Sequence, residues 1–478
     1  MKNLRSVAIA ALLVIVAMGC GSTNEKADVA ADASGAAGEA ATSESKDAAA
    51  VEDEAASTGS GSSSATVSSG GASGVVPGST GGKSASGLPL GTGNIKIGFH
   101  YSENLDTAYR ALGASGSFVN MVGAIESMVK YVNANGGLGG KKVVPIMHGT
   151  DPLNGTFPAQ AEAACTKFAQ DEKVFATVQG AVLPDINSAA CHAKYSSPLV
   201  WSYQYILDRK SQDLYEDYLY TPQGIAVDRY DFYIDELWKA KFLTKSSKVG
   251  LFRYDDPIHK LFLDTVVKPG LKKYGLGVID KPLRRPQSAG EAGEVGAQAA
   301  NAIIDFNSKG VDRVLFIPSG GAIPFIVGPV AENQNYFPRY AFTSYDIPTF
   351  LTDNLSDTQL EGAVTLGWMP TNDTYLPQAG KSAALERCFK AAGVRSATVV
   401  RFCDGLFFLK DSLDRTPLFD VSGLKKAAYA LGSSFASPWS MGVKLRPGRH
   451  DGATSFKLMR FTASCSCFMY TGSAKPIP

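Results

Sequence analysis

Apolar residues follow two periods from residue 95 onward. The run 95–99 is short and apolar, which is typical of a buried strand in a parallel sheet. The next segment spaces apolar side chains three and four residues apart, as an amphipathic helix does. Gly136 and Gly137 end this helix, because glycine enters the left-handed region freely, and a second apolar run follows at 143–148. The predicted helical stripe consists of Phe118, Met121, Val122, Ile125, Met128, Val129 and Val132.

The same alternation continues and then begins again at 248–252. Two α/β halves that each start afresh predict a two-lobed molecule, and open parallel sheets bind ligands at the carboxyl ends of their strands. Before the restart we expect helix 157–170, strand 174–178, helix 185–195 capped by Asp185, strand 199–202 and helix 227–239. After it we expect helix 258–274, strand 277–279, helix 291–309, strands 311–317, 340–344 and 362–366, a helical part over 381–431, and strands near 455–461 and 468–470.

The first 20 residues are typical of a targeting segment. Lys2 and Arg5 precede an apolar core at 7–18 that is too short to span a bilayer, and small residues lead to Cys20. This pattern predicts a bacterial lipoprotein signal in which Cys20 is acylated and anchors the protein to the membrane. The alternative is an ordinary secretory signal with a chance cysteine. Both place the protein outside the cytoplasm.

Residues 21–93 contain mostly Ala, Ser, Gly, Thr, Glu and Asp. Such a segment cannot bury enough apolar surface to offset the entropy cost of ordering it. We therefore expect a flexible tether with a root-mean-square span of about 45 Å.

Composition narrows the classes of function. Residues 94–478 exceed a comfortable single core, which supports two lobes. The formal charge of +1 provides no field that would recruit nucleic acid. No nucleophile elbow, His-Glu-x-x-His or P-loop is present, and the glycines at 136–140 follow a helix instead of opening one. We therefore expect no enzyme activity, no catalytic residues, no metal and no cofactor.

The cysteines beyond Cys20 number six, an even count that favours disulfides in an exported protein. Six cysteines allow 15 pairings, and their order along the chain favours local ones. A zinc site is the alternative, but no Cys-x-x-Cys or nearby His supplies its ligands. The expected pairs are Cys165–Cys191, Cys388–Cys403 and Cys465–Cys467.

Several segments together carry a family resemblance over nearly all of 94–478: 95–98, 132–142, 248–251, 402–405, 447–452 and 465–472. Through them the chain resembles type I extracytoplasmic solute-binding proteins, in particular the leucine/isoleucine/valine-binding protein family, which serves branched-chain amino acid ABC transporters. The three segments from residue 402 onward are similar to actinobacterial members.

The resemblance implies a periplasmic-binding-protein type I fold of two parallel-sheet α/β lobes. The chain would cross between the lobes three times, near 220–224, 367–372 and 437–442. Lobe 1 would comprise 94–221 plus 370–439, and lobe 2 would comprise 222–369 plus 440–478. Ligand would bind in the cleft between them, which closes by hinge motion.

The family's ligand-contacting loops are carried over by position. Amino-acid binders of this family have a Ser-rich third loop and a Thr-containing fourth loop, whereas this chain has Ala181, Val182 and an aromatic fourth loop instead. A buried ligand carboxylate without donors is costly, so a larger or flatter ligand is expected. The predicted ligand-binding residues are His100, Tyr101, Ser102, Gln179, Leu183, Ser202, Tyr203, Gln204, Tyr205, Tyr254, Asp255, Ser319, Gly320, Tyr345 and Asp346.

Several of these residues have a second interpretation. Asp346 either pairs a ligand cation or caps a helix before Pro348. Asp255 and Asp256 form either a weak cation site or a turn or helix N-cap before Pro257. Tyr203 and Tyr205 stack on ligand or pack at the hinge, and the Tyr-rich segment 215–220 packs at the surface or a lobe edge. The remaining histidines, taken as ordinary surface or turn residues, are His148, His192, His259 and His450.

The main hypothesis is a monomeric, membrane-tethered receptor that captures a small polar or aromatic molecule and delivers it to an ABC permease. One alternative is an envelope sensor that uses the same cleft without transport. Another is an envelope hydrolase that uses His100 and Asp346.

Overall fold

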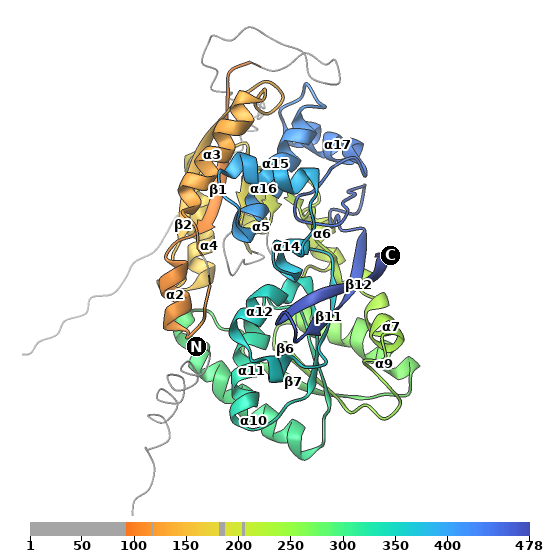
Figure 1. Cartoon of the computed structure of the whole chain (residues 1–478). Helices are drawn as coiled ribbons and strands as arrows, with labels where there is room; N and C mark the ends of the chain where they lie inside the picture. Colours follow the sequence, from red (N-terminus) through yellow and green to blue (C-terminus); the bar gives the residue numbers. More distant parts are fainter. Residues whose placement is uncertain (1–91, 117, 181–186, 203–205) are drawn as a thin grey trace, which may run out of the picture. The chain divides into compact units, whose positions relative to one another are not determined.

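The computed structural model describes residues 92–478 apart from 117, 181–186 and 203–205. The predicted signal, Cys20 and almost all of the tether lie outside the described residues, as do Leu183, Tyr203, Gln204 and Tyr205. The described chain forms two α/β sheets with helices around them, seen in Figure 1. In this part of the chain no helix is both long and apolar enough to cross a membrane.

The first sheet is entirely parallel, with the order β2-β1-β3-β4-β5. Strand β1, an interior strand of this sheet, places Ile97 and Phe99 against the core, fully shielded from solvent, as the apolar pattern predicts. The turn before β2 uses Gly136 and Gly137 at φ 89° and 65°, which confirms the predicted helix stop. The strands are β1 (Asn94–Ser102), β2 (Lys142–Thr150), β3 (Ala176–Gln179), β4 (Leu199–Trp201) and β5 (Leu219–Tyr220).

The second sheet has the order β12-β11-β10-β9-β8-β6-β7. Strands β6 to β10 are parallel, whereas β11 runs antiparallel to both β10 and β12. The last two strands therefore form a hairpin added to one edge of a parallel sheet. The strands are β6 (Val249–Tyr254), β7 (Val278–Leu283), β8 (Arg313–Phe316), β9 (Arg339–Thr343), β10 (Val364–Gly367), β11 (Ser455–Thr462) and β12 (Cys467–Pro476).

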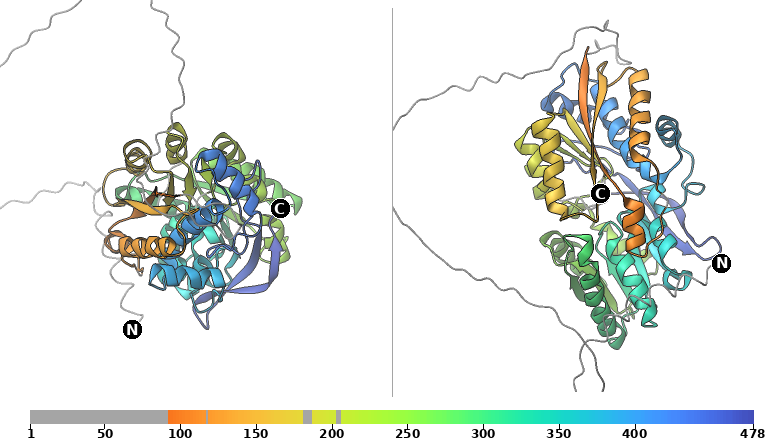
Figure 2. Two further views of the ribbon diagram at one scale, coloured as in Figure 1. Left: turned by 90° about the horizontal axis from the view of Figure 1, so that it is seen from above. Right: turned by 90° about the vertical axis from the view of Figure 1, so that its left-hand side faces the viewer.

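Helices lie on both faces of the first sheet, which is most visible in the right-hand view of Figure 2. Those from the first part of the chain are α2 (Leu105–Ala111), α3 (Met121–Ala134), α4 (Phe157–Cys165), η1 (Thr166–Asp171), α5 (Asn187–Lys194) and α6 (Arg209–Leu214). Around the second sheet lie η2 (Val227–Arg229), α7 (Phe232–Lys239), α8 (Pro257–Phe262), η3 (Leu263–Val267), α9 (Lys268–Lys273), η4 (Ala289–Glu291), α10 (Ala292–Ser308), α11 (Ala322–Asn333), η5 (Ser344–Asp346), α12 (Pro348–Asn354) and α13 (Asp357–Leu360). The late helices are α14 (Pro370–Asp373), α15 (Ala383–Ala392), α16 (Ala397–Leu413) and α17 (Val421–Leu431).

The chain visits each sheet twice. After β10 it returns to the first sheet, where α15 and α16 pack against α3 and α16 contacts β3. It then leaves again to add β11 and β12 to the second sheet. This path confirms the predicted two-lobed class with three crossings, while the predicted lobe boundaries stay a prediction.

A buried ion pair ties the segment after the first predicted crossing to the segment after the third. The Arg229 guanidinium donates to Asp451 Oδ2 at 2.7 Å and to the Ala453 carbonyl at 2.6 Å. Both charged side chains are almost completely buried, at 3% and 0% exposed. Removing one partner would leave the other charge buried and uncompensated, so the pair holds these segments in a single arrangement.

The histidine interpretation needs correction. His192, His259 and His450 are buried instead of lying at the surface. His450 makes structural hydrogen bonds: its ring nitrogens lie 2.9 Å from the Leu219 carbonyl oxygen and 2.5 Å from the Tyr429 hydroxyl. These histidines are buried because strands and helices distant in sequence cover them.

All three expected disulfides are present. Cys165–Cys191 joins the end of α4 to α5, and Cys388–Cys403 joins α15 to α16. Cys465–Cys467 closes within the turn of the β11–β12 hairpin.

Candidate functional site

The predicted ligand residues lie at or just after the carboxyl ends of parallel strands in both sheets. In the first sheet these strands are β1, β3 and β4, and in the second they are β6, β8 and β9. His100, Tyr101 and Ser102, expected in a loop, are instead the last three residues of β1. Neighbouring parallel strands end at the same edge of a sheet, so each set of loops lies along one edge. This is the edge at which open α/β sheets bind ligands.

His100 lies near the end of β1 and is 5% exposed. Its Nε2 lies 2.5 Å from Thr150 Oγ1, and its ring packs beside those of His148 and Phe168. Burial lowers the pKa of His100 to about 3, helped by the nearby His148 and His192. The imidazole is therefore neutral at ordinary pH and is held between β1 and β2. Contact with a ligand stays a prediction.

Tyr101 and Ser102, the last two residues of β1, are half-buried. The Tyr101 hydroxyl donates to Glu103 Oε1 at 3.3 Å. Burial raises the pKa of Tyr101, and the neighbouring Glu103 carboxylate raises it further. Tyr101 and Ser102 thus remain partly accessible at the strand end, unlike His100.

Helix α16 covers the loops after β3 and β4. Gln179 is 2% exposed and Ser202 is fully buried. A Cβ on Gly405 would lie 2.9 Å from Ser202 Oγ and 2.6 Å from a Val178 methyl, so only glycine allows this approach. Ser202 Oγ has no hydrogen-bond partner among the described residues.

Asp404, beside this contact, was not predicted as a site residue. It is fully buried, and its Oδ1 accepts from the Ser437 hydroxyl. Burial raises the pKa of Asp404 to about 7, against the smaller effects of hydrogen bonds from Ser437 and the Trp439 amide. A charged residue inside the apolar run 399–409 was the signal that could have indicated it.

In the second sheet, Tyr254 is the last residue of β6 and Asp255 follows it. Tyr254 is buried, and the Arg285 guanidinium lies 5.5 Å from its ring centroid. Asp255 is exposed, and its Oδ1 accepts from the Arg285 amide at 3.1 Å. Asp256 caps α8 through the His259 amide at 2.9 Å, which confirms the helix-cap interpretation for Asp256.

Ser319 and Gly320 follow β8 and face the Asp346 turn. Ser319 Oγ accepts from the Ile323 amide at 3.2 Å at the start of α11. Gly320 and Gly321 adopt φ 68° and 82°, and a Cβ on Gly321 would lie 2.9 Å from the Asp346 carbonyl oxygen. The two turns therefore approach closely.

Asp346 is fully buried at the end of β9. Its Oδ2 accepts from the Thr343 amide at 2.9 Å and the Thr343 hydroxyl at 3.1 Å, and it forms a capping box on η5. Its Oδ1 has no hydrogen-bond partner among the described residues. Burial raises the pKa of Asp346 to about 7, and interactions with Thr343 and with the Ser319 amide oppose this shift. The side chain caps a helix and still has one oxygen to offer.

Aromatic side chains surround the Asp346 turn. The Tyr345 hydroxyl accepts from the Ile225 amide at 3.1 Å, and its ring meets Trp368 edge-on at 5.0 Å. Tyr230 lies 6.3 Å from Trp368, and its hydroxyl, like that of Tyr233, has no hydrogen-bond partner among the described residues. Neither Trp368 nor these two tyrosines was predicted as a site residue, because none of them lies in a predicted ligand loop. Trp368 lies in a predicted crossing, Tyr230 directly follows η2, and Tyr233 lies in α7.

Segments of the two predicted lobes touch directly. The Ser115 amide donates to Asn354 Oδ1 at 2.6 Å, and Asn354 Nδ2 donates back to the Ser115 carbonyl at 3.1 Å. The Tyr109 ring of α2 meets Phe350 of α12 edge-on at 5.3 Å. We call these four residues the α2–α12 contact.

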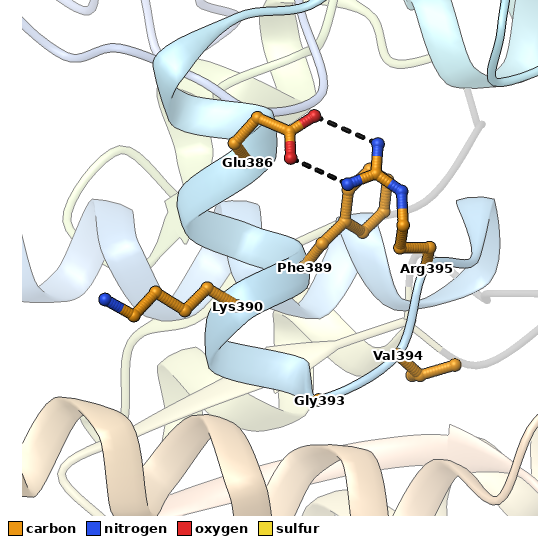
Figure 3. A pocket seen from close by; sticks show the side chains of 6 residues that line it. All are labelled: Glu386, Phe389, Lys390, Gly393, Val394 and Arg395. Carbon is orange, nitrogen blue, oxygen red and sulfur yellow. Dashed lines mark hydrogen bonds and ion pairs between the residues drawn. The ribbon is translucent and has the colours of Figure 1, made fainter.

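Surface hollows occur away from these loops. One lies at the end of α15, where Arg395 pairs with both Glu386 oxygens at 2.7 and 2.9 Å and its guanidinium covers the Phe389 ring (Figure 3). Another is lined by Ile304, Asn307, Ser308 and Gln334. Neither contains a predicted ligand residue. Within the described ranges, no three His, Cys, Asp or Glu side chains gather as metal ligands would.

No protein-family model matches this chain, and no curated protein matches its sequence. Many solved structures match its fold. A possible leucine/isoleucine/valine-binding protein from Rhodopirellula baltica is 14% identical with a TM-score of 0.57, covering 80% of this chain and 96% of that one. The isoleucine complex of LivJ, a branched-chain amino acid transporter substrate-binding protein from Streptococcus pneumoniae, is 15% identical with a TM-score of 0.55, covering 80% and 99%.

A fatty acid ABC transporter substrate-binding protein from Thermomonospora curvata is 16% identical with a TM-score of 0.55, covering 83% of this chain and 95% of that one. These neighbours are binding proteins and not enzymes by their descriptions. At such low identities the likeness shows the fold, and this chain has the type I periplasmic-binding-protein fold.

Proposed function

We propose that this protein is an extracytoplasmic solute-binding protein, tethered to the bacterial membrane through acylated Cys20, that delivers a small molecule to an ABC importer. Its ligand binds at the strand ends of both sheets and stabilises the closed arrangement. The predicted loops supply the contacts. The fold and the named roles of its structural neighbours support this proposal.

The observation that carries the proposal is the unpartnered Asp346 Oδ1 at the end of β9. A buried polar atom without a partner is costly, so its presence at the ligand-binding edge points to a group that a ligand supplies. A carboxylate beside aromatic rings favours a cationic group such as an ammonium. We therefore propose a ligand that carries an amino group and a flat or aromatic body.

The test is calorimetric titration of the purified chain with amino acids, aromatic amines, amides and polyols. For an ammonium-bearing ligand, Asp346→Asn should weaken binding at least about tenfold, because the charge is lost while the Thr343 hydrogen bond can persist. Wild-type affinity should fall as the pH drops below about 7, since the raised pKa protonates the Asp346 carboxyl there. The variant should lack this pH dependence.

Asp373→Asn is the matched control. Asp373 is equally buried, burial also raises its pKa to about 7, and its Oδ1 likewise has no hydrogen-bond partner among the described residues. It differs from Asp346 in lying in α14 and not among the predicted ligand residues, and its Oδ2 is bound to the Tyr470 hydroxyl at 2.6 Å and to the Met369 amide at 3.0 Å. Its substitution should leave affinity unchanged. Equal losses in both variants would contradict a direct role for Asp346. Tight binding of leucine, isoleucine or valine would contradict the expectation of a larger ligand.

A further inference from the structure

The three disulfides differ sharply in accessibility. Two of them join helices in the core, and their cysteines are 0–6% exposed. In the third, Cys465 is exposed in the turn of the β11–β12 hairpin, while Cys467 begins β12 and is 1% exposed. Among the described cysteines, Cys465 alone is an exposed residue. An attacking thiolate therefore reaches this bond without unfolding of the core.

The ring closed by Cys465–Cys467 contains one intervening residue. That residue, Ser466, has φ 47°, the left-handed conformation that non-glycine residues avoid. The two helix-joining disulfides span 26 and 15 residues and need no such conformation. The hairpin backbone thus pays a conformational cost for its disulfide that the others do not.

Opening this bond should also cost the fold little. A disulfide stabilises a protein mainly by restricting the unfolded chain, and this restriction grows with loop length. A separation of 2 residues restricts the unfolded chain much less than a separation of 26 or 15. In addition, packed helices keep the other two cysteine pairs aligned when reduced, which favours their re-formation.

We propose that Cys465–Cys467 is a thiol-exchange site that reacts reversibly with an external dithiol. A thiolate of the dithiol attacks Cys465 Sγ, the disulfide bond breaks, and Cys467 leaves as a thiolate that takes a proton from water. The second thiolate of the dithiol then attacks the mixed disulfide and releases Cys465. The dithiol is oxidised to a disulfide, and both cysteines are reduced to thiols.

The site is remote from the predicted ligand edge. β11 pairs antiparallel with β10 so that Arg460 lies opposite Val364, the first residue of β10. The turn that follows β11 therefore lies beyond the amino end of β10, whereas ligand loops follow carboxyl ends. The inference consequently stands independently of the proposed function.

The test is graded reduction of the folded full chain with dithiothreitol, followed by acid quenching, alkylation and peptide mass spectrometry. Cys465 and Cys467 should become alkylated at about tenfold lower dithiothreitol than the other four cysteines, which act as internal controls. Circular dichroism should remain unchanged at that concentration. Simultaneous or later alkylation of Cys465 and Cys467 would overturn the proposal.

Two variants separate backbone strain from the loss of a hydroxyl contact. Ser466 Oγ donates to Asp357 Oδ1, and both Ser466→Gly and Ser466→Ala remove this bond. Only glycine relieves the left-handed backbone. Reduction of Ser466→Gly should therefore need about fivefold more dithiothreitol than reduction of Ser466→Ala. If both variants need the same dithiothreitol concentration, the left-handed backbone of Ser466 does not make this disulfide easier to reduce.

Discussion

Three buried carboxyl groups near the chain crossings and strand ends have similar surroundings. Asp346, Asp373 and Asp404 are each fully buried, and each has one oxygen without a hydrogen bond among the described residues. Burial raises the pKa of each to about 7. Each group therefore changes its protonation near neutral pH, far above the range of an exposed aspartate.

For Asp404, the raised pKa gives a definite sign to a stability prediction. The folded pKa lies above the unfolded value of 3.8. The stabilising contribution of the protonated Asp404 carboxyl to the unfolding free energy is therefore fully present below about pH 4 and is lost as the pH rises through about 7. Asp404→Asn cannot ionise. Its unfolding free energy relative to wild type should therefore rise by about 4 kcal/mol between pH 4 and pH 8, measured by urea denaturation.

The exposed Asp213 supplies the control for this measurement. Asp213→Asn should track the wild type across the same pH range. If the unfolding free energy of Asp404→Asn also follows that of the wild type at every pH, burial does not raise the pKa of Asp404 and the prediction is wrong.

The sequence predicts the location of a single residue when that location depends only on its position along a strand. The end of β9 placed Asp346 at the ligand edge of the sheet. Asp373 and Trp368 escaped prediction because their burial depends on segments far along the chain, such as Tyr470 and Gln223. Sequence pattern reports the period of an element, but not what later packs against it.

Among the elements, α16 shows how a single glycine sets a packing distance. A Cβ on Gly405 would meet Val178 at 2.6 Å and Ser202 at 2.9 Å, so the helix would have to move away from the sheet. Gly405→Ala should lower the unfolding free energy by about 1–3 kcal/mol through overpacking. Chemical denaturation measures this directly.

Gly296 in α10 is the matched control, because a Cβ there meets nothing within 4 Å. Gly296→Ala should stabilise the chain by about 0.5–1 kcal/mol, since alanine is the better helix former. Stabilisation by both substitutions would show that α16 has room beside β3 and β4.

The strands and long helices were predictable because their apolar periods are strong. Residues 121–134 and 292–308 are clear helical stripes, and both form helices. The short helices α2 and α12 and the two-residue strand β5 were not predicted, because elements this short contain too few apolar residues to show a periodic pattern. Residue Tyr220, expected in a connection at the surface or a lobe edge, is fully buried in β5, at the edge of the first sheet.

For the whole molecule, restarting apolar patterns predicted two sheets, but the direct α2–α12 contact came only from the structure. Asn354 makes two hydrogen bonds to Ser115, and Tyr109 meets Phe350. Each such hydrogen bond contributes about 1 kcal/mol. Asn354→Ala should therefore raise the population with this contact open at least about fivefold, detected by small-angle X-ray scattering of the chain without ligand.

Asn307→Ala, an exposed position in α10, provides the comparison and should leave the scattering curve unchanged. Identical curves for Asn354→Ala and wild type would show that this contact does not hold the two halves together.

The central claim is that a small molecule binds at the carboxyl strand ends of the two sheets. Its most direct test is the unfolding free energy of the purified chain with and without each member of the panel of amino acids, aromatic amines, amides and polyols. At 100 times its dissociation constant, a true ligand should add about 2.7 kcal/mol. We predict this increase for at least one member that carries an amino group. No increase with any member of the panel would contradict the account.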